Sequence, residues 1–260
     1  MVPKDNAAFC RIAAVAFWAT VLIPASAIAG PPFRTDDPEP VESGHYEFYT
    51  FTSGTHVTGG TAGVGPAFEF NYGLIPDGQF HIVVPGAFNS PADGPASFGV
   101  GDTELGFKYR FIQEDKDGWR PMVGIFPMLE LPTGDLNRGL GAGHARLFLP
   151  LWVQKSLPDD WQTYGGGGYN INQDNMLGDK NYWFTGWLLQ RKWTEKLTLG
   201  GEVFYQTATS IFSKDSAGFN IGGVYDVDEH NHILFSAGRG FLNASTTYQY
   251  SWYLGYQITR

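Results

Sequence analysis

Apolar and polar residues alternate along most of the chain from residue 45 to its end. The clearest case is ELGFKYRF at 104–111, where leucine and aromatic residues occupy every second position. Because side chains of a β-strand point alternately to opposite faces, this segment has one apolar and one polar face. The same pattern recurs at 68–74, 145–154 and 246–259. It predicts an all-β protein.

Turn signals divide this part of the chain into twelve predicted strands, and most exceed the roughly 5–6 residues usual in soluble sheets. About 9–11 residues cross a bilayer as a tilted strand, so most of these strands are long enough to span a membrane. The predicted strands cover 45–55, 65–75, 79–89, 99–113, 120–131, 144–157, 161–172, 181–193, 197–209, 216–227, 232–241 and 246–259.

The links between the predicted strands alternate in length. Most links after even-numbered strands are tight, at 76–78, 157–160, 194–196 and 228–231. Most links after odd-numbered strands are longer and rich in Gly, Asn and Asp, at 57–64, 90–98, 132–143 and 173–180. Outer-membrane barrels have an even strand number, short periplasmic turns and longer outer loops. The pattern predicts a transmembrane antiparallel up-and-down β-barrel of about 12 strands, with both termini in the periplasm.

A soluble β-sandwich would also show alternation, because it buries apolar faces between two sheets. Strand length, the alternating links and the aromatic residues favour the barrel instead. Membrane barrels carry aromatic girdles at both interfaces, and tryptophans lie mainly toward the ends of the predicted strands. The tryptophans assigned to these girdles are Trp152, Trp161, Trp183, Trp187, Trp193 and Trp252.

Residues 1–29 are predicted to be a cleaved signal peptide. Basic residues precede an apolar run at 12–23, and Ala27 and Ala29 form a small-x-small cleavage pattern. The run is too short to cross a bilayer as a helix, which needs about 20 residues, although an uncleaved anchor is the alternative. Residues 30–44 are then a periplasmic N-terminal segment, and 45–260 form the barrel.

Composition agrees with an exported barrel. Charged residues make up only 17% of the chain while aromatic residues make up 16%, and the mean hydropathy is −0.19. The net charge of −9 argues against nucleic acid, because phosphate binding needs clustered Lys and Arg. The one cysteine, Cys10, lies in the predicted signal peptide, so the mature chain would form no disulfide within itself.

Three stretches carry a family resemblance: FRTDDPEP at 33–40, GVGDTELGFKYRF at 99–111 and LELPTGD at 129–135. With them the chain resembles the outer-membrane β-barrel family labelled "putative meta-pathway of phenol degradation" proteins, often described as transporters. The resemblance covers essentially the whole mature chain. It implies an outer-membrane location and passage of small solutes, hydrophobic or aromatic ones among them. Such barrels usually end in an aromatic residue that the assembly machinery reads, whereas this chain ends in Arg260.

If the apolar face contacts lipid, the polar face lines the lumen. Two interpretations stay open: a static network of ion pairs that fills the interior, or a polar path that orients a passing solute. The candidate lumen-lining residues are Glu47, Glu69, His81, Glu104, Lys108, Arg110, Glu130, Arg146, Glu202 and Asp226, with Gln206 and His232 beside them.

The predicted function is a channel for small solutes. A structural or interaction barrel with a plugged lumen is the alternative, and an outer-membrane lipid hydrolase is a more distant one. No catalytic residue, metal site or cofactor is predicted, because no His lies in a recognisable nucleophile–base signature. The expected partners are outer-membrane lipid, a small-molecule solute and the barrel assembly machinery, and not nucleic acid.

Two further features have specific expectations. The acidic residues Asp36, Asp37 and Glu39 could bind a cation, but a solvated periplasmic tail is the preferred interpretation. The four glycines at 165–168 are predicted to mark a bend of the wall or a place where something packs closely against it.

Overall fold

The computed structural model describes residues 31–115, 117–174 and 178–260, so the predicted signal peptide with Ala27 and Ala29 lies outside the described residues. Within those ranges, the chain forms fourteen strands, a 3-10 helix at Leu136–Arg138 and a four-residue helix, α1 (Ala244–Thr247). No helix in the described part is long and apolar enough to cross a membrane. The strands are β1 (Tyr46–Val57), β2 (Gly60–Ile75), β3 (Gly78–Pro91), β4 (Ser97–Val100), β5 (Thr103–Ile112), β6 (Met122–Ile125), β7 (Met128–Leu131), β8 (Arg146–Ser156), β9 (Trp161–Asn172), β10 (Tyr182–Thr194), β11 (Leu197–Gln206), β12 (Ser216–Asp226), β13 (Asn231–Leu242) and β14 (Tyr250–Thr259).

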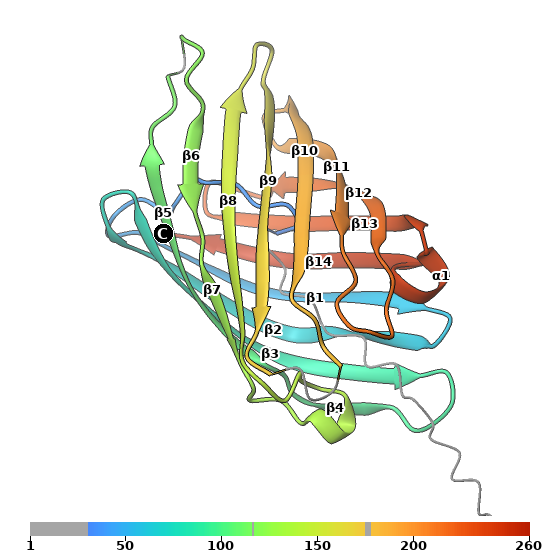
Figure 1. Ribbon diagram of the computed structural model, residues 1–260. Helices are drawn as coiled ribbons and strands as arrows, with labels where there is room; N and C mark the ends of the chain where they lie inside the picture. Colours follow the sequence, from blue (N-terminus) through green and yellow to red (C-terminus); the bar gives the residue numbers. More distant parts are fainter. Residues whose placement is uncertain (1–30, 116, 175–177) are drawn as a thin grey trace, which may run out of the picture.

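The strands form one closed antiparallel barrel (Figure 1). β1 pairs with β2 on one side and with β14 on the other, from Glu47 opposite Thr259 to His56 opposite Tyr250. Two of the wall strands are interrupted: β4 and β5 both pair with β3, and β6 and β7 both pair with β8. The fourteen segments therefore occupy twelve positions around the barrel, which confirms the predicted strand number.

The interruption of the fifth wall strand has a physical cause in its sequence. Phe126 and Pro127 separate β6 from β7, and proline has no N–H to donate to a neighbouring strand. Its carbonyl still accepts a hydrogen bond from the Phe107 N–H of β5, 3.1 Å away. The regular strand ladder is thus interrupted at this point, but the wall stays hydrogen-bonded.

The fourth wall strand is interrupted at Gly101 and Asp102, between β4 and β5. The Asp102 carboxylate turns to the link that follows β7 and accepts hydrogen bonds from the Gly134 N–H (2.8 Å) and the Ala142 N–H (2.6 Å). The Arg138 guanidinium of the same link donates to the Phe98 carbonyl of β4 (2.9 Å). Side chains, rather than a strand ladder, therefore connect β4 to the link.

Alternation along the strands puts apolar side chains on the outside of the barrel. In β10, Tyr182, Phe184 and Leu188 are buried, while Trp183 and Trp187 between them are exposed. A surface of such side chains suits contact with hydrocarbon, which the outer band of a membrane barrel provides. β2 has 16 residues and β3 has 14, so both exceed the length needed to cross a bilayer.

The structure corrects two predicted boundaries. The link predicted at 57–64 is a tight hairpin, because β1 continues to Val57 and β2 begins at Gly60. The last strand starts at Tyr250 rather than at 246, because α1 occupies the residues before it. The other links keep the predicted alternation, except that the link 113–121 is longer than the remaining turns at its end of the barrel.

Candidate functional site

Residues 31–45, here called the N-terminal segment, lie inside the barrel. The Pro32 carbonyl accepts a hydrogen bond from Ser236 Oγ of β13 (2.5 Å), and the Val41 N–H donates to Gln79 Oε1 of β3 (2.9 Å). Phe33 is 1% exposed and packs with Tyr164 of β9 and Leu188 of β10, although it stands among polar residues in the sequence. Burial of a phenylalanine side chain contributes about 1.5–3 kcal/mol. The segment is thus part of the packed interior.

The middle of the N-terminal segment binds a carboxylate on one side of the lumen. Glu202 of β11 is 2% exposed and accepts hydrogen bonds from the Arg34 N–H (2.8 Å), the Thr35 N–H (2.8 Å) and Thr35 Oγ1 (2.6 Å). Asn220 Nδ2 of β12 donates a further hydrogen bond to it (2.5 Å). These donors satisfy a carboxylate that would be costly to bury alone.

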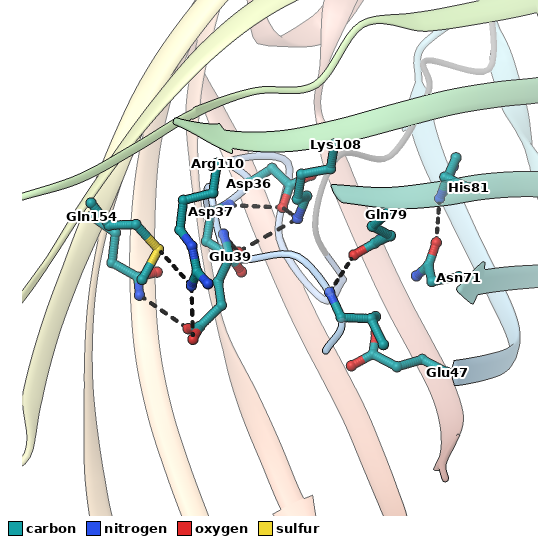
Figure 2. Close-up of polar contacts among 12 residues, drawn as sticks. Asp36, Asp37, Glu39, Glu47, Asn71, Gln79, His81, Lys108, Arg110 and Gln154 are labelled. Carbon is teal, nitrogen blue, oxygen red and sulfur yellow. Dashed lines mark hydrogen bonds and ion pairs between the residues drawn. The ribbon is translucent and has the colours of Figure 1, made fainter. Parts of the chain in front are cut away.

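Cations from β5 bind the same segment on the other side of the lumen (Figure 2). Lys108 Nζ lies 3.0 Å from Asp36 Oδ1 and 3.5 Å from Asp37 Oδ1. Arg110 forms a close ion pair with Asp77 in the turn before β3 (2.6 Å) and a longer one with Glu39 (3.8 Å). Because β5 and β11 lie on opposite sides of the closed sheet, the segment crosses the lumen.

The prediction of a solvated acidic tail is therefore wrong for this part of the segment. Asp36 is 1% exposed, and its partner Lys108 is 6% exposed. Asp37 and Glu39 are less buried but also face cations of the wall. Sequence reasoning missed this because all of these contacts join residues far apart in the chain.

Glycines of the wall leave room for the segment. A Cβ added to Gly186 of β10 would collide with Thr35 Oγ1, and one added to Gly73 of β2 would collide with the Glu42 carbonyl oxygen. A Cβ at Gly124 of β6 would lie 3.0 Å from Pro38 Cβ. Single glycines at these wall positions are the sequence signal that could have indicated an object inside the barrel.

A second polar cluster joins wall strands to one another. His81 Nδ1 of β3 lies 2.7 Å from Asn71 Oδ1 of β2, and His81 Nε2 lies 3.0 Å from Glu104 Oε1 of β5. Asn71 Nδ2 donates to Glu69 Oε1 (2.8 Å). Both ring nitrogens of His81 therefore lie within hydrogen-bond distance of oxygen atoms of neighbouring strands. All four side chains are buried, and Figure 2 shows His81 pointing to Asn71.

The other predicted lumen residues also have partners. Arg146 of β8 pairs with Glu130 of β7 through its Nε, at 2.9 Å. Glu47 accepts from Tyr49 Oη (2.7 Å), and Asp226 lies 2.7 Å from His232 at the end of β12. The cavity beside Arg146 and Glu130 has a volume of only about 10 Å³, which is about the smallest that holds a single water molecule. A larger recess of 460 Å³ opens on the outer wall, where Thr52, Pro66 and Leu254 border it.

Part of the interior is aromatic, although only polar residues were predicted to line the lumen. Trp152, predicted for an interfacial girdle, is 0% exposed and lies in this interior cluster, which comprises Phe126, Met128, Phe148, Trp152, Phe184, Phe204 and Tyr248. The wall glycines 165–168 lie against the neighbouring strands β8 and β10, so the close packing there is with the wall itself. Among the described residues, no group of three or more His, Cys, Asp or Glu side chains is placed to hold a metal ion.

Several solved structures of outer-membrane proteins are similar to this chain. The chain is similar in structure to the COG4313 outer membrane channel from Pseudomonas putida F1, with a TM-score of 0.70, 14% identity, and coverage of 86% of this chain and 98% of that one. It is also similar to the NanC porin, with a TM-score of 0.58, 8% identity, and coverage of 81% and 98%. The KdgM porin gives a TM-score of 0.55, 12% identity, and coverage of 82% and 98%.

These likenesses show a shared barrel fold. The comparison with curated proteins gave no match. The family model described as "Putative MetA-pathway of phenol degradation" matches residues 35–258, which is nearly the whole described chain. The protein therefore belongs to the family described as "Putative MetA-pathway of phenol degradation".

Proposed function

We propose that this protein is an outer-membrane channel for small solutes, and that the N-terminal segment holds it closed. The observation that carries the proposal is the position of the segment, which crosses the lumen and pairs with charged groups on opposite sides. A twelve-stranded barrel is wider than eight-stranded barrels, whose interiors side chains fill, and narrower than 16-stranded porins. Withdrawal of the segment from such a barrel would leave a path for small solutes.

The partners of the charged groups favour a path over a static network. Lys108 pairs with the segment, and Glu202 takes three of its four hydrogen bonds from it. Loss of the segment would expose both groups to the lumen. By contrast, the pairs Glu130–Arg146 and His81–Glu104 join wall strands and would remain.

Solutes with aromatic rings suit this interior. The buried side chains of Phe126, Phe148 and Trp152 form an apolar face beside the segment, and ring-to-ring contacts favour aromatic ligands. The description of the family, which concerns phenol degradation, agrees with this solute class. The proposed function is passage, not catalysis, and a lipase assay on the detergent-solubilised protein is expected to show no activity.

The proposed site of action is the outer membrane, with both termini in the periplasm. The start of β1 and the end of the chain lie at one rim, since the Tyr46 N–H donates to the Arg260 carbonyl (2.7 Å) and the Tyr46 carbonyl accepts a hydrogen bond from the Arg260 N–H (2.9 Å). Most of the tight turns lie at this same rim, which supports the periplasmic assignment. The expected partners are outer-membrane lipid and the barrel assembly machinery.

A structural barrel with a plugged lumen is the second candidate, and the packed burial of Phe33 favours it. Recording from purified protein in planar bilayers separates the two. A channel should show brief openings in the wild type and longer openings in variants that release the segment. A complete lack of conductance in the wild type and in all such variants would support the plugged barrel.

A further inference from the structure

The Arg34 side chain lies in a group of three aromatic rings, here called the aromatic cage: Phe184 of β10, Phe204 of β11 and Tyr248 before β14. The guanidinium carbon is 4.4 Å from the centre of the Phe204 ring, 5.1 Å from that of Phe184 and 5.5 Å from that of Tyr248. A cation within about 6 Å of an aromatic ring centre is attracted by the electron-rich face of the ring. Three rings therefore hold one positive charge.

The cage also contains oxygen acceptors. Arg34 Nη2 donates to Gln206 Oε1 of β11 (2.8 Å). The Glu202 carboxylate next to it accepts backbone N–H groups from the segment. Tyr248 Oη (2.5 Å) and Ser251 Oγ (2.9 Å) both lie close to Asn220 Oδ1, so the Asn220 amide nitrogen points to Glu202. The wall thus fixes the carboxylate before any ligand arrives.

All of these receptor groups belong to the barrel wall and its rim, while Arg34 and Thr35 belong to the N-terminal segment. The rings are also packed on one another, with Phe204 and Tyr248 at 4.8 Å and Phe184 and Phe204 at 6.4 Å between centres. The cage would therefore persist if the segment withdrew. Glu202 would then keep only the hydrogen bond from Asn220, and a buried carboxylate with so few donors attracts a cation.

We propose that the aromatic cage and Glu202 form a binding site for solutes with a planar organic cation, such as a guanidinium or amidinium group, and that Arg34 occupies this site as a tethered ligand in the closed state. The inference rests on the proposed function, because a solute reaches the cage only through an opened lumen. A planar cation stacks on the rings, and its N–H groups reach the oxygens of Glu202 and Gln206. A neutral ring of the same shape makes the stacking contact alone.

Binding of benzamidinium, with the neutral isostere benzamide as its control, tests the site in the full-length folded protein. The substitution Arg34→Ala removes the tethered cation, and calorimetry in detergent is expected to show benzamidinium binding at least about tenfold tighter than in the wild type. Benzamide should bind weakly to both proteins. Adding Glu202→Gln to Arg34→Ala should reverse the gain, since the amide keeps the shape but lacks the charge.

The control variant is Arg191→Ala, which removes another guanidinium that lies over two rings, 5.0 Å from the centre of Trp193 and 5.6 Å from that of Trp161, and has its own hydrogen bond to the Asp159 carbonyl. It should leave benzamidinium binding unchanged. Equal binding of benzamidinium and benzamide by Arg34→Ala, no binding of either, or no effect of Glu202→Gln would overturn the proposal. Conductance is recorded separately: binding without any conductance would refute the channel, and conductance without binding would refute the cage.

Discussion

The Lys108 ammonium lies 3.0 Å from the Asp36 carboxylate, and both side chains are buried inside the barrel. One group belongs to a wall strand and the other to the segment that precedes the first strand, 72 positions away in the chain. The pair joins the N-terminal segment to β5 across from the hydrogen bonds of Glu202. The closed state therefore depends on charges that the segment supplies.

The substitution Lys108→Met should release the N-terminal segment. It leaves Asp36 buried without its cation, and removal of one partner from a buried ion pair costs about 3–5 kcal/mol. The wall strands keep their ladders, so this cost falls mainly on docking of the segment. We expect longer channel openings in planar bilayers and faster trypsin cleavage after Arg34.

Lys155→Met is the matched control for that change. Lys155 also pairs with a carboxylate, Glu114, at 2.9 Å, but in the link after β5 rather than across the lumen. This part-buried pair joins the link to β8 and not to the N-terminal segment, so its loss should leave docking of the segment unchanged. Both variants should fold as barrels. Similar channel openings and similar trypsin cleavage in the two variants would contradict the role given to Lys108.

A methyl group at Gly186 should displace the segment without harm to the barrel. The Cβ of Gly186→Ala would collide with Thr35 Oγ1. Hydrogen exchange of residues 31–45 is expected to become at least about tenfold faster, because local opening sets the exchange rate of docked segments. In the control Gly201→Ala, the new Cβ is 3.4 Å from the nearest heavy atom, an ordinary contact. Unchanged exchange in Gly186→Ala would argue that the segment tolerates the clash and is held elsewhere.

Asp102 should control the stability of the link that follows β7. Asp102→Ala removes the acceptor of the Gly134 and Ala142 N–H groups, and the loss of each such hydrogen bond costs roughly 0.5–1.5 kcal/mol. We expect faster trypsin cleavage after Arg138 in this link. Asp93→Ala, a change in the exposed link between β3 and β4, should leave the rate as in the wild type. Equal rates in both variants would show that Asp102 does not hold the link.

The link between β11 and β12 should lose stability only in strong acid. The hydrogen bond from Tyr205 Oη, with a second from the Ala208 N–H, holds the pKa of Asp215 below its ordinary value of 3.8. A depressed pKa contributes stability that is complete above 3.8 and is lost as the pH falls through the lower, folded-state value. Hydrogen exchange of the Ala208 amide, corrected for intrinsic rates, should become faster in the wild type as the pH falls through the folded-state pKa of Asp215. In Asp215→Asn, this exchange should already be faster at neutral pH. A wild-type transition at pH 5 or 6 would contradict this assignment.

Much of the wall could be predicted because it depends on local periodicity. Strand alternation alone assigns Trp152 to the inner face, since Leu151 and Val153 on either side belong to the opposite one. The girdle prediction for Trp152 failed because it followed residue type instead of this parity. The break at Gly101–Asp102 was missed because it depends on contacts with a link that is distant in the chain. The break at Phe126–Pro127 had a local signal in Pro127, which the strand prediction for 120–131 did not use.

The interior could be predicted only in part, because periodicity assigns the inward-facing wall residues but not their partners. Lys108 and Glu202 follow from alternation, but their partners come from a segment without any periodic pattern. The Thr35–Glu202 hydrogen bond joins positions 167 residues apart, and nothing local in the sequence indicates it. The apolar residue Phe33 within a polar stretch and the wall glycine Gly186 are the available hints.

The conductance of a variant in which a reducible disulfide holds the N-terminal segment to the wall tests the central claim most directly. In the double variant Thr35→Cys/Gly186→Cys, the two new side chains face each other within the lumen. The chain's own Cys10 lies in the predicted signal peptide. The oxidised protein, with the segment bonded to β10, should show little conductance in planar bilayers, and reductant should open it, while the wild type should not respond to reductant. Equal conductance before and after reduction, with the disulfide verified by mass spectrometry, would contradict the claim that the N-terminal segment closes this channel.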